Sequence, residues 1–267
     1  MTSLIHRTWG ICLLTGLIAV SPSVHAQVPD SILEEEPIMS SAAPIPDRIE
    51  GVNRFFFKFN DGFYRYALRP ISRGYAAVVP RPVRRGIGNF FNNLRFPTRF
   101  VGNVLEGQPK AALKETGRFL VNTTAGLGGF VQVADDIPEL RVPPSDLGQA
   151  FARWGIGHGT YLVLPLMGAT SLRDGTGEGI SGAYLSPQRY LPEWEYSAAA
   201  QTLNVVNESP ELMDMYFNFK ESAVDPYIAL RDAFAARRSA MVRERPGNAA
   251  RVAAPENERS PAAATAP

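Results

Sequence analysis

Cysteine and histidine are scarce in this chain of 267 residues. The single cysteine, Cys12, and two of the three histidines, His6 and His25, lie near the N-terminus, which leaves His158 alone in the rest. Without the N-terminal segment no disulfide or thiolate nucleophile can form. One imidazole without carboxylates at a matching spacing does not make a zinc site. We therefore expect no metal and no cofactor.

An excess of charge of either sign is also missing. The chain has 27 Lys+Arg and 26 Asp+Glu, a formal net charge of +1, and residues 1–26 contain Arg7 but no acid. A chain so close to neutral lacks the basic footprint of proteins that bind duplex nucleic acid. Its 45% hydrophobic content is enough for one sizeable core and too ordinary for a fibrous or disordered chain. We expect no nucleic-acid partner.

Long apolar runs are missing too. Residues 11–20 are apolar apart from Thr15 and Gly16, and every later run is interrupted by proline, glycine or charge. A membrane-spanning helix needs ~20 such residues. A basic start, a short apolar centre and the small-residue exit at 24–26 predict a cleaved signal peptide, residues 1–26. The mature chain would have no transmembrane helix.

Composition divides the remaining chain into three parts. Residues 27–46 combine proline, small residues and an acidic triplet, which predicts a flexible tether. Residues 246–267 are rich in alanine and proline and predict a disordered tail. Residues 47–245 remain as one folded domain.

Helical spacing dominates the folded part. Apolar residues between 49 and 66 recur every three or four positions, which predicts one helix, and Pro70 and Pro80 are expected to interrupt the next segment. Helix starts are predicted at prolines in five places: Pro82, Pro97, Pro109, Ser209-Pro210 and Asp225-Pro226. Only residues 161–166 suggest a short extended piece, after a glycine-rich turn at 155–159. We predict a mainly α fold.

The aromatic run on the first helix is the least ordinary feature. Phe55, Phe56, Phe59 and Phe63 share its apolar stripe, and Arg54 and Arg65 flank it. A wide apolar face with basic edges suits a membrane interface. The commoner meaning of such a stripe is a helix packed in a protein core, and both interpretations stay open.

Two enzymatic hypotheses are weak. Residues 177–182 match the letters G-x-G-x-x-G, but no strand is predicted before them, so they lack the context of a nucleotide site. Ser171 or Ser181 could be combined with His158 and Asp174 into a hydrolase, but no G-x-S-x-G elbow is present. We expect no enzyme.

Taken together, short motifs in a fixed order resemble the VacJ/MlaA family of phospholipid-binding outer-membrane lipoproteins. The resemblance runs from about Asp47 to Arg238. Its main motifs are Asp47-x-x-Glu50-x-x-Asn53-Arg54, Asn93-Leu94, Asn122-Thr123, Gly126-x-x-Gly129, Asp146-x-Gly148-Gln149, Trp154-Gly155-x-Gly157-x-Gly159-x-Tyr161, Leu172-Arg173-Asp174 and Asp225-Pro226-Tyr227-Ile228.

The resemblance implies a ring of many short helices around an amphipathic channel, on the periplasmic side of the outer membrane. Phospholipids misplaced in the outer leaflet would pass through it to a periplasmic lipid carrier, which maintains outer-membrane lipid asymmetry. Trimeric porins are the second implied partner. The alternative is a structural envelope protein that binds a porin without moving lipid.

Candidate residues follow from the two lines of reasoning together. Lipid contacts are expected from the four phenylalanines above and from four arginines: Arg54, Arg65, Arg173 and Arg231. Hinges or tight turns are expected at Gly155, Gly157 and Gly159. Relatives carry a lipidated cysteine, but bulky Ile11 precedes Cys12 and the signal continues beyond it, so we expect no lipid anchor.

Overall fold

The computed structural model describes residues 45–243 and 245; the expected signal peptide, most of the tether and the tail lie outside them. In chain order the main elements are α2 (Glu50–Phe63), α3 (Arg69–Val78), α4 (Arg81–Leu94), α5 (Phe96–Leu105), α6 (Pro109–Thr124), α7 (Leu147–Arg153), β1 (Tyr161–Leu164), β2 (Gly168–Ser171), α8 (Leu172–Ile180), α9 (Trp194–Ser222) and α10 (Pro226–Arg243). The prediction of a mainly α fold is confirmed.

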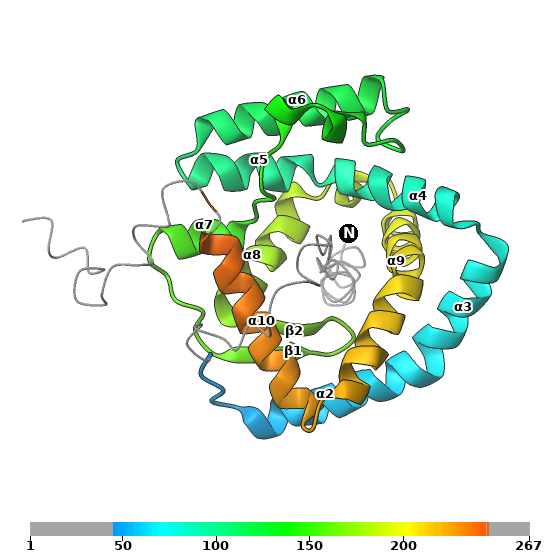
Figure 1. The fold of residues 1–267 in the computed structure, drawn as a ribbon, viewed down its shortest axis with the longest axis vertical. Coiled ribbons are helices and arrows are strands. Elements are labelled where there is room, and N and C mark those ends of the chain that lie inside the picture. Colours follow the sequence, from blue (N-terminus) through cyan, green and yellow to red (C-terminus); the bar gives the residue numbers. More distant parts are fainter. Residues whose placement is uncertain (1–44, 244, 246–267) are drawn as a thin grey trace, which may run out of the picture.

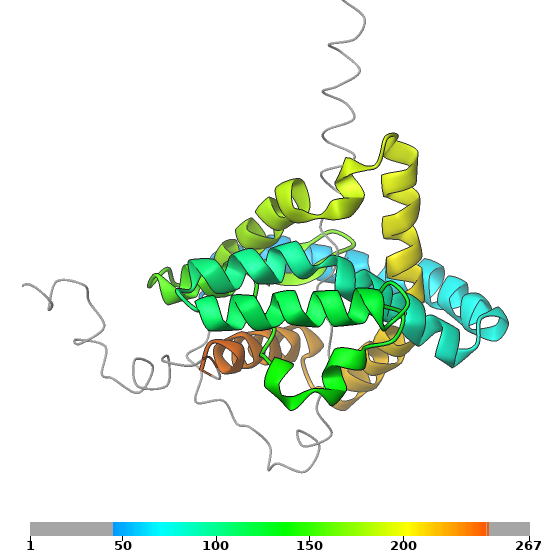
Figure 2. The same cartoon turned by 90° about the horizontal axis from the view of Figure 1, so that it is seen from above.

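The helices are arranged as a ring (Figure 1). Two sides consist of α2 with α3 and of α4 with α5, and α7, α8 and α10 form a third side. Helix α6 packs on the outside of α5, and α9 runs beside α3 and α4. Seen from above, the ring is flattened, and the corner where α9 begins projects from it (Figure 2). The expected ring of short helices is therefore present.

Prolines open the helices of one side of the ring as predicted. Pro82, Pro97 and Pro109 each lie in the first turn of α4, α5 and α6. Their missing N–H would have no partner within the helix at that position. The backbone of Gly107, which separates α5 from α6, has a φ of +71°, a conformation that favours glycine.

The predicted interruption at Pro70 is wrong. Helices α2 and α3 are joined by a π-helical turn, Tyr64–Leu68, so the chain is helical from residue 50 to residue 78. The wider turn adds one residue just before Pro70, where a regular α-helix would lose a hydrogen bond and meet the proline ring. Pro80 does separate α3 from α4.

The predicted helix start at Ser209-Pro210 is also wrong, because α9 continues through Pro210. Tertiary contacts hold the chain helical on either side. Asn207 accepts a hydrogen bond from the Tyr75 hydroxyl (2.8 Å) and donates one to the Arg84 carbonyl (3.0 Å). The Asp225-Pro226 start is confirmed, since the Asp225 carboxylate accepts hydrogen bonds from two backbone N–H groups at the start of α10.

The extended piece is one strand of an antiparallel hairpin in which β1 pairs with β2, Tyr161 opposite Ser171. Two asparagines of α2 bind the other edge of β1. Asn53 donates to the Tyr161 carbonyl and accepts from the Val163 N–H; Asn60 does the same with Leu164 and Leu166. Because a side-chain amide carries both N–H donors and a carbonyl acceptor, the two asparagines pair with backbone groups of β1 and of Leu166 just after it, as a neighbouring strand would.

Candidate functional site

The polarity of α2 is the reverse of that of a helix in a water-soluble core. Asn53 and Asn60 are buried, and Phe55 and Phe59 are 64% and 48% exposed. Part of the apolar stripe predicted from the sequence, including Phe55 and Phe59, is therefore exposed. Polar groups lie inward and find hydrogen-bond partners there, as buried amides must.

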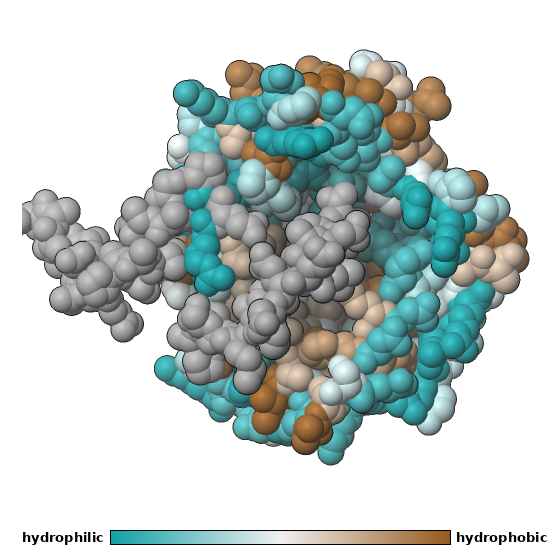
Figure 3. All heavy atoms as spheres, viewed as in Figure 1, coloured by the Kyte–Doolittle hydropathy of each residue, from teal (hydrophilic) through white to brown (hydrophobic). Residues whose placement is uncertain are grey.

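Other helices repeat this arrangement. Their buried side chains include Ser72, Asn93, Asn103, Glu115, Asn122 and Gln201. Their exposed apolar side chains include Ile71, Val78, Val83, Phe100, Val104, Leu113, Leu120, Leu172, Ile180, Leu203 and Met215. In Figure 3 hydrophobic surface gathers on the outer rim, over α6 and at the corner between α3 and α4. Exposed apolar surface on this scale marks a membrane or protein contact.

The four candidate phenylalanines fall into two groups. Phe55 and Phe59 are exposed on the rim. Phe56 is half-buried against the cluster around Tyr161 and Tyr227, and Phe63 against the cluster around Phe217. The first pair is available to a lipid or a partner, and the second pair anchors α2.

Three of the four candidate arginines are partly exposed and ion-paired. Arg54 contacts Glu50 (2.6 Å) and Asp225 (3.0 Å), and its guanidinium lies 4.3 Å from the Tyr227 ring centroid. Arg65 lies 3.8 Å from Asp61, and Arg231 lies 3.1 Å from Asp232. These arginines could reach a head group only at the rim or by exchanging a partner.

Arg173, the fourth, is buried in an ion cluster where α7, α8 and α10 meet. Its Nε donates to Asp174 (3.0 Å), and Arg238 bridges Asp174 (2.7 Å) and Asp146 (2.7 and 3.0 Å). Burial alone would raise the pKa of Asp146, but the charge and hydrogen bonds of Arg238 hold it below its usual range. Burial acts the same way on the pKa of Asp174, and His158, Arg238 and Arg173 lower it. This cluster holds the ring together rather than facing a ligand.

The residues of the hydrolase hypothesis do come together, but in a capping arrangement. The Ser171 hydroxyl is buried and donates to Asp174 (2.8 Å), while accepting from the Asp174 N–H as the N-cap of α8. His158 also faces Asp174 (3.4 Å), so the carboxylate rather than the imidazole is next to the serine. Ser181 donates to the Gly177 carbonyl. Neither serine has the base that activates a nucleophile.

The glycines show two kinds of packing. Gly155 and Gly159 have φ of +86° and +69°, which glycine adopts without strain, and they form the turn before β1. Gly157 has open space around it. A strand, β2, does precede the G-x-G-x-x-G letters, contrary to expectation, but Gly177 lies inside α8, where a Cβ would be 2.6 Å from the Gly148 nitrogen. Its role is a close helix crossing.

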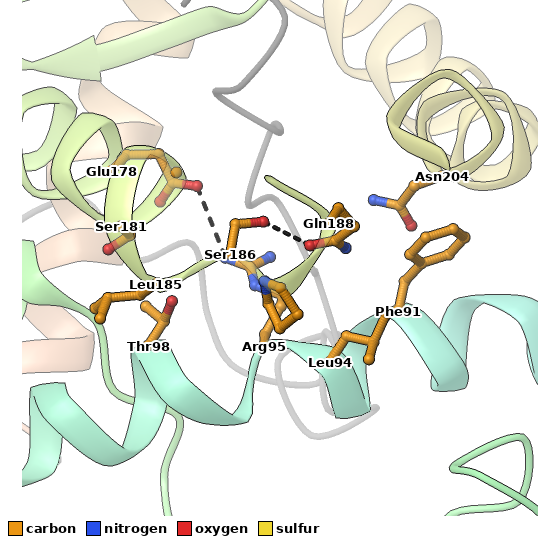
Figure 4. A pocket seen from close by; sticks show the side chains of 12 residues that line it. Phe91, Leu94, Arg95, Thr98, Glu178, Ser181, Leu185, Ser186, Gln188 and Asn204 are labelled. Atoms are coloured by element: carbon orange, nitrogen blue, oxygen red, sulfur yellow. Dashed lines mark hydrogen bonds and ion pairs between the residues drawn. The ribbon is translucent and has the colours of Figure 1, made fainter. Parts of the chain in front are cut away.

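A small pocket of about 40 Å³ lies between α4, α5, the segment after α8, and α9. Apolar and polar side chains both line it: Phe91, Leu94, Leu185, Arg95, Thr98, Glu178, Ser181, Gln188 and Asn204. In Figure 4 these side chains converge from three sides, and Arg95 reaches toward Glu178 (3.9 Å). One turn beyond Asn204 on α9, burial raises the pKa of Glu208 to about 7. The sequence carried no signal for this pocket, since its residues are scattered over more than 100 positions.

Two negative findings apply to residues 45–243 and 245. They contain no group of His, Cys, Asp and Glu side chains arranged to hold a metal ion. None of their helices combines the length and apolar character needed to cross a bilayer.

A ring of helices that exposes many large apolar side chains and buries many polar ones has the surface of proteins that contact a membrane or another protein. Residues 45–241 match the family model described as MlaA lipoprotein. The chain belongs to the MlaA family.

Relatives and a solved structure agree with this assignment. The chain is 35% identical over 196 residues to the "Intermembrane phospholipid transport system lipoprotein MlaA" of Haemophilus influenzae (70% of this chain, 76% of the relative). It is 35% identical over 191 residues to the protein of the same name in Escherichia coli (70% and 75%). A solved structure described as "Structural basis for maintenance of bacterial outer membrane lipid asymmetry" is 33% identical, with a TM-score of 0.64 over 73% of this chain and 98% of the other.

Proposed function

We propose that this protein is the outer-membrane component of an intermembrane phospholipid transport system, which removes misplaced phospholipids from the outer leaflet and so maintains lipid asymmetry. The names of the relatives support this proposal. The observation that carries it is the reversed polarity of the ring: exposed apolar side chains such as Phe55 outside, hydrogen-bonded amides such as Asn53 inside.

The physical problem of such transport is the exposure of acyl chains. Each CH₂ that leaves the membrane for water costs ~0.8 kcal/mol. An apolar rim lets the ring sit among acyl chains at the periplasmic side, where Phe55 and Phe59 contact lipid. A passage lined by both apolar and polar groups would lower the barrier for a molecule with a charged head and apolar tails. No bond is made or broken, in keeping with the capped and buried Ser171.

Partners and hinges belong to the same proposal. A trimeric porin would hold the ring in the membrane and a periplasmic carrier would accept the lipid. The protein would stay at the membrane through its rim rather than through a lipid anchor. Gly155, Gly157 and Gly159 would give the turn before β1 the freedom to adjust as lipid passes. At the rim, Arg54, Arg65 and Arg231 would contact phosphates, whereas Arg173, buried against Asp174, would stabilise the ring.

A second candidate is a structural envelope protein whose apolar rim binds only a porin. The same exposed side chains favour it, because a protein surface can cover them as well as acyl chains can. The two candidates differ in whether phospholipid is present in the purified protein and whether its removal from the outer leaflet depends on this protein.

The test uses the full chain purified from membranes in mild detergent. We expect bound phospholipid by mass spectrometry, and loss of outer-leaflet phospholipid removal in a deletion strain. Replacing Phe55 and Phe59 with serine should lower flotation with phospholipid vesicles at least about tenfold, since a buried phenylalanine contributes ~1.5–3 kcal/mol. Lys58→Ser, exposed on the same helix, is the control and should float normally. Lipid-free protein that still binds porin would favour the structural role.

A further inference from the structure

A second and larger hollow lies outside the pocket described above, between α3, the start of α4 and the middle of α9. Its volume is about 420 Å³, within the range of small-molecule sites. It is lined by Arg69, Ser72, Arg73 and Ala76 of α3, Arg81 and Arg84 of α4, and Pro210, Glu211, Met213 and Asp214 of α9. We call it the arginine groove.

The arginines of the groove differ in how far their N–H donors find partners within the protein. Arg84 is buried and pairs with Glu211 (2.6 Å), yet its Nε finds no hydrogen-bond acceptor in the part of the chain that the structure describes. Arg69 lies over the Phe217 ring (4.5 Å). Arg73 and Arg81 are exposed and form no ion pair with any described residue. The groove therefore presents two cations with free donors, which is the chemistry that binds phosphate.

The opposite wall carries a charge of the other sign. Asp214 follows Glu211 on α9, and its carboxylate forms no ion pair within residues 45–243 and 245. Arg73 and Arg81 come from α3 and α4, so the free cations and the free carboxylate belong to different walls. A single anion would leave Asp214 without a partner, but a ligand that carries both a phosphate and a cation matches both walls.

The surroundings of the groove are apolar. Val78 at the end of α3 is 81% exposed, and Ile71 and Val83 are exposed on the two helices that carry the free arginines. In Figure 3 hydrophobic surface at the corner between α3 and α4 adjoins hydrophilic surface along α3 and α9. A charged groove beside an exposed apolar corner fits a ligand with a polar head and acyl chains.

We propose that the arginine groove binds the head group of a zwitterionic phospholipid, with its phosphate at Arg73 and Arg81 and its ammonium group at Asp214. This inference rests on the proposed function and deepens it by naming a head-group class, a phosphate joined to a primary ammonium. The groove selects this class over lipids whose head group carries phosphate alone, since those leave Asp214 facing negative charge.

The experiment compares variants of the full chain in mild detergent. Binding of fluorescent phosphatidylethanolamine and phosphatidylglycerol is measured for the wild type, for Arg73→Gln with Arg81→Gln, and for Asp214→Asn. We expect the double variant to bind both lipids about tenfold more weakly, and Asp214→Asn to lose only the preference for phosphatidylethanolamine. Arg85→Gln is the matched control, because Arg85 is exposed on α4 but does not line the groove.

Soluble glycerophosphoethanolamine tests the source of the head group. It should compete weakly, because it lacks acyl chains for the apolar corner; competition as strong as that of the lipid would overturn a lipid site in favour of a soluble phosphoester. Unchanged preference in Asp214→Asn, or displacement of the probe by an acidic peptide alone, would also overturn the proposal. If wild type and all variants retain phospholipid equally, the groove assignment fails while the proposed function stands. If the wild type binds no phospholipid, the proposed function itself fails.

Discussion

Two corners of the ring treat charge in opposite ways. Where α7, α8 and α10 meet, Arg238 makes three short contacts to Asp146 and Asp174; the Asp174 side chain is buried and that of Asp146 is largely buried. Where α3, α4 and α9 meet, Arg73 and Arg81 stay exposed beside Asp214. We call them the closed corner and the open corner.

The difference separates charged side chains that stabilise the fold from charged side chains that are free to bind a ligand. A buried ion pair repays its desolvation only when the hydrogen bonds around it are complete, and removing one partner then leaves a buried charge uncompensated. Exposed charges keep their water and contribute little to stability. The closed corner is therefore costly to disturb, and the open corner can exchange water for a ligand.

The difference between the two corners is tested most directly by replacing one arginine in each. Arg238→Met should lower the free energy of unfolding by about 3–5 kcal/mol, because Asp146 and Asp174 lose their shared partner. Arg73→Gln should change it by less than about 0.5 kcal/mol. Chemical denaturation in detergent, followed by circular dichroism, measures both. Equal effects would show that the corners do not differ.

A glycine of the closed corner gives a second test of the same point. A Cβ on Gly148 would lie 2.4 Å from Asp174 Oδ1 and 2.7 Å from an Arg238 nitrogen. Gly148→Ala should therefore destabilise the protein. Gly74→Ala, where a Cβ would meet open space on α3 at the open corner, should be neutral or slightly stabilising because alanine favours helix.

The next effect concerns α2, which joins neither corner but holds the hairpin. Asn60→Ala removes two hydrogen bonds and leaves the Leu164 carbonyl and the Leu166 N–H without them. We expect a loss of about 2–3 kcal/mol in the free energy of unfolding. Asn218→Ala, an exposed asparagine of α9, should cost less than about 0.5 kcal/mol. A similar small loss for Asn60→Ala would mean that water replaces the amide easily.

Much of the fold could be predicted from local patterns, and its polarity could not. First-turn prolines such as Pro82 and Pro109 mark helix starts because the missing N–H costs no intrahelical hydrogen bond there. The helix start predicted at Pro210 is wrong because Asn207 is held by Tyr75 and Arg84 of other helices, and the local sequence does not show those contacts. The stripe at Phe55 and Phe59 has a helical period, but a period does not say which face is exposed.

The sites were harder still to predict. The arginine groove combines two neighbouring helices, α3 and α4, with residues of α9 more than 120 positions later, and no local spacing predicts it. Arginine binds phosphate, which makes Arg173 a candidate for a head-group contact, but the sequence does not show that Asp174 and His158 contact its guanidinium in the fold. A sequence shows the sign of each charged side chain, but it does not show which group that side chain pairs with in the fold.

The smallest predicted effect distinguishes the carboxylates of the closed corner from Glu208 of α9 by the pH dependence of stability. Because the pKa of Asp174 and of Asp146 is lowered, their contribution to stability is present at neutral pH and is lost only as pH falls below the usual carboxyl range. Glu208 behaves oppositely. Burial raises its pKa from 4.5 to about 7, against the opposing influence of Arg95 and Asn204. Between pH 4.5 and about 7, Glu208 is protonated in the folded protein but ionised in the unfolded chain. The unfolded chain then binds fewer protons, so the free energy of unfolding falls as pH rises.

Glu208→Gln should therefore remove a decline of about 1–2 kcal/mol in the free energy of unfolding between pH 4.5 and 7, allowing for solvent screening. The variant keeps the shape of the side chain and cannot ionise, so the difference between its pH profile and that of the wild type isolates Glu208 from other groups. Glu195→Gln, at an exposed position in the first turn of α9, is the control. Parallel profiles for wild type and Glu208→Gln would show that Glu208 ionises in the folded protein at no cost.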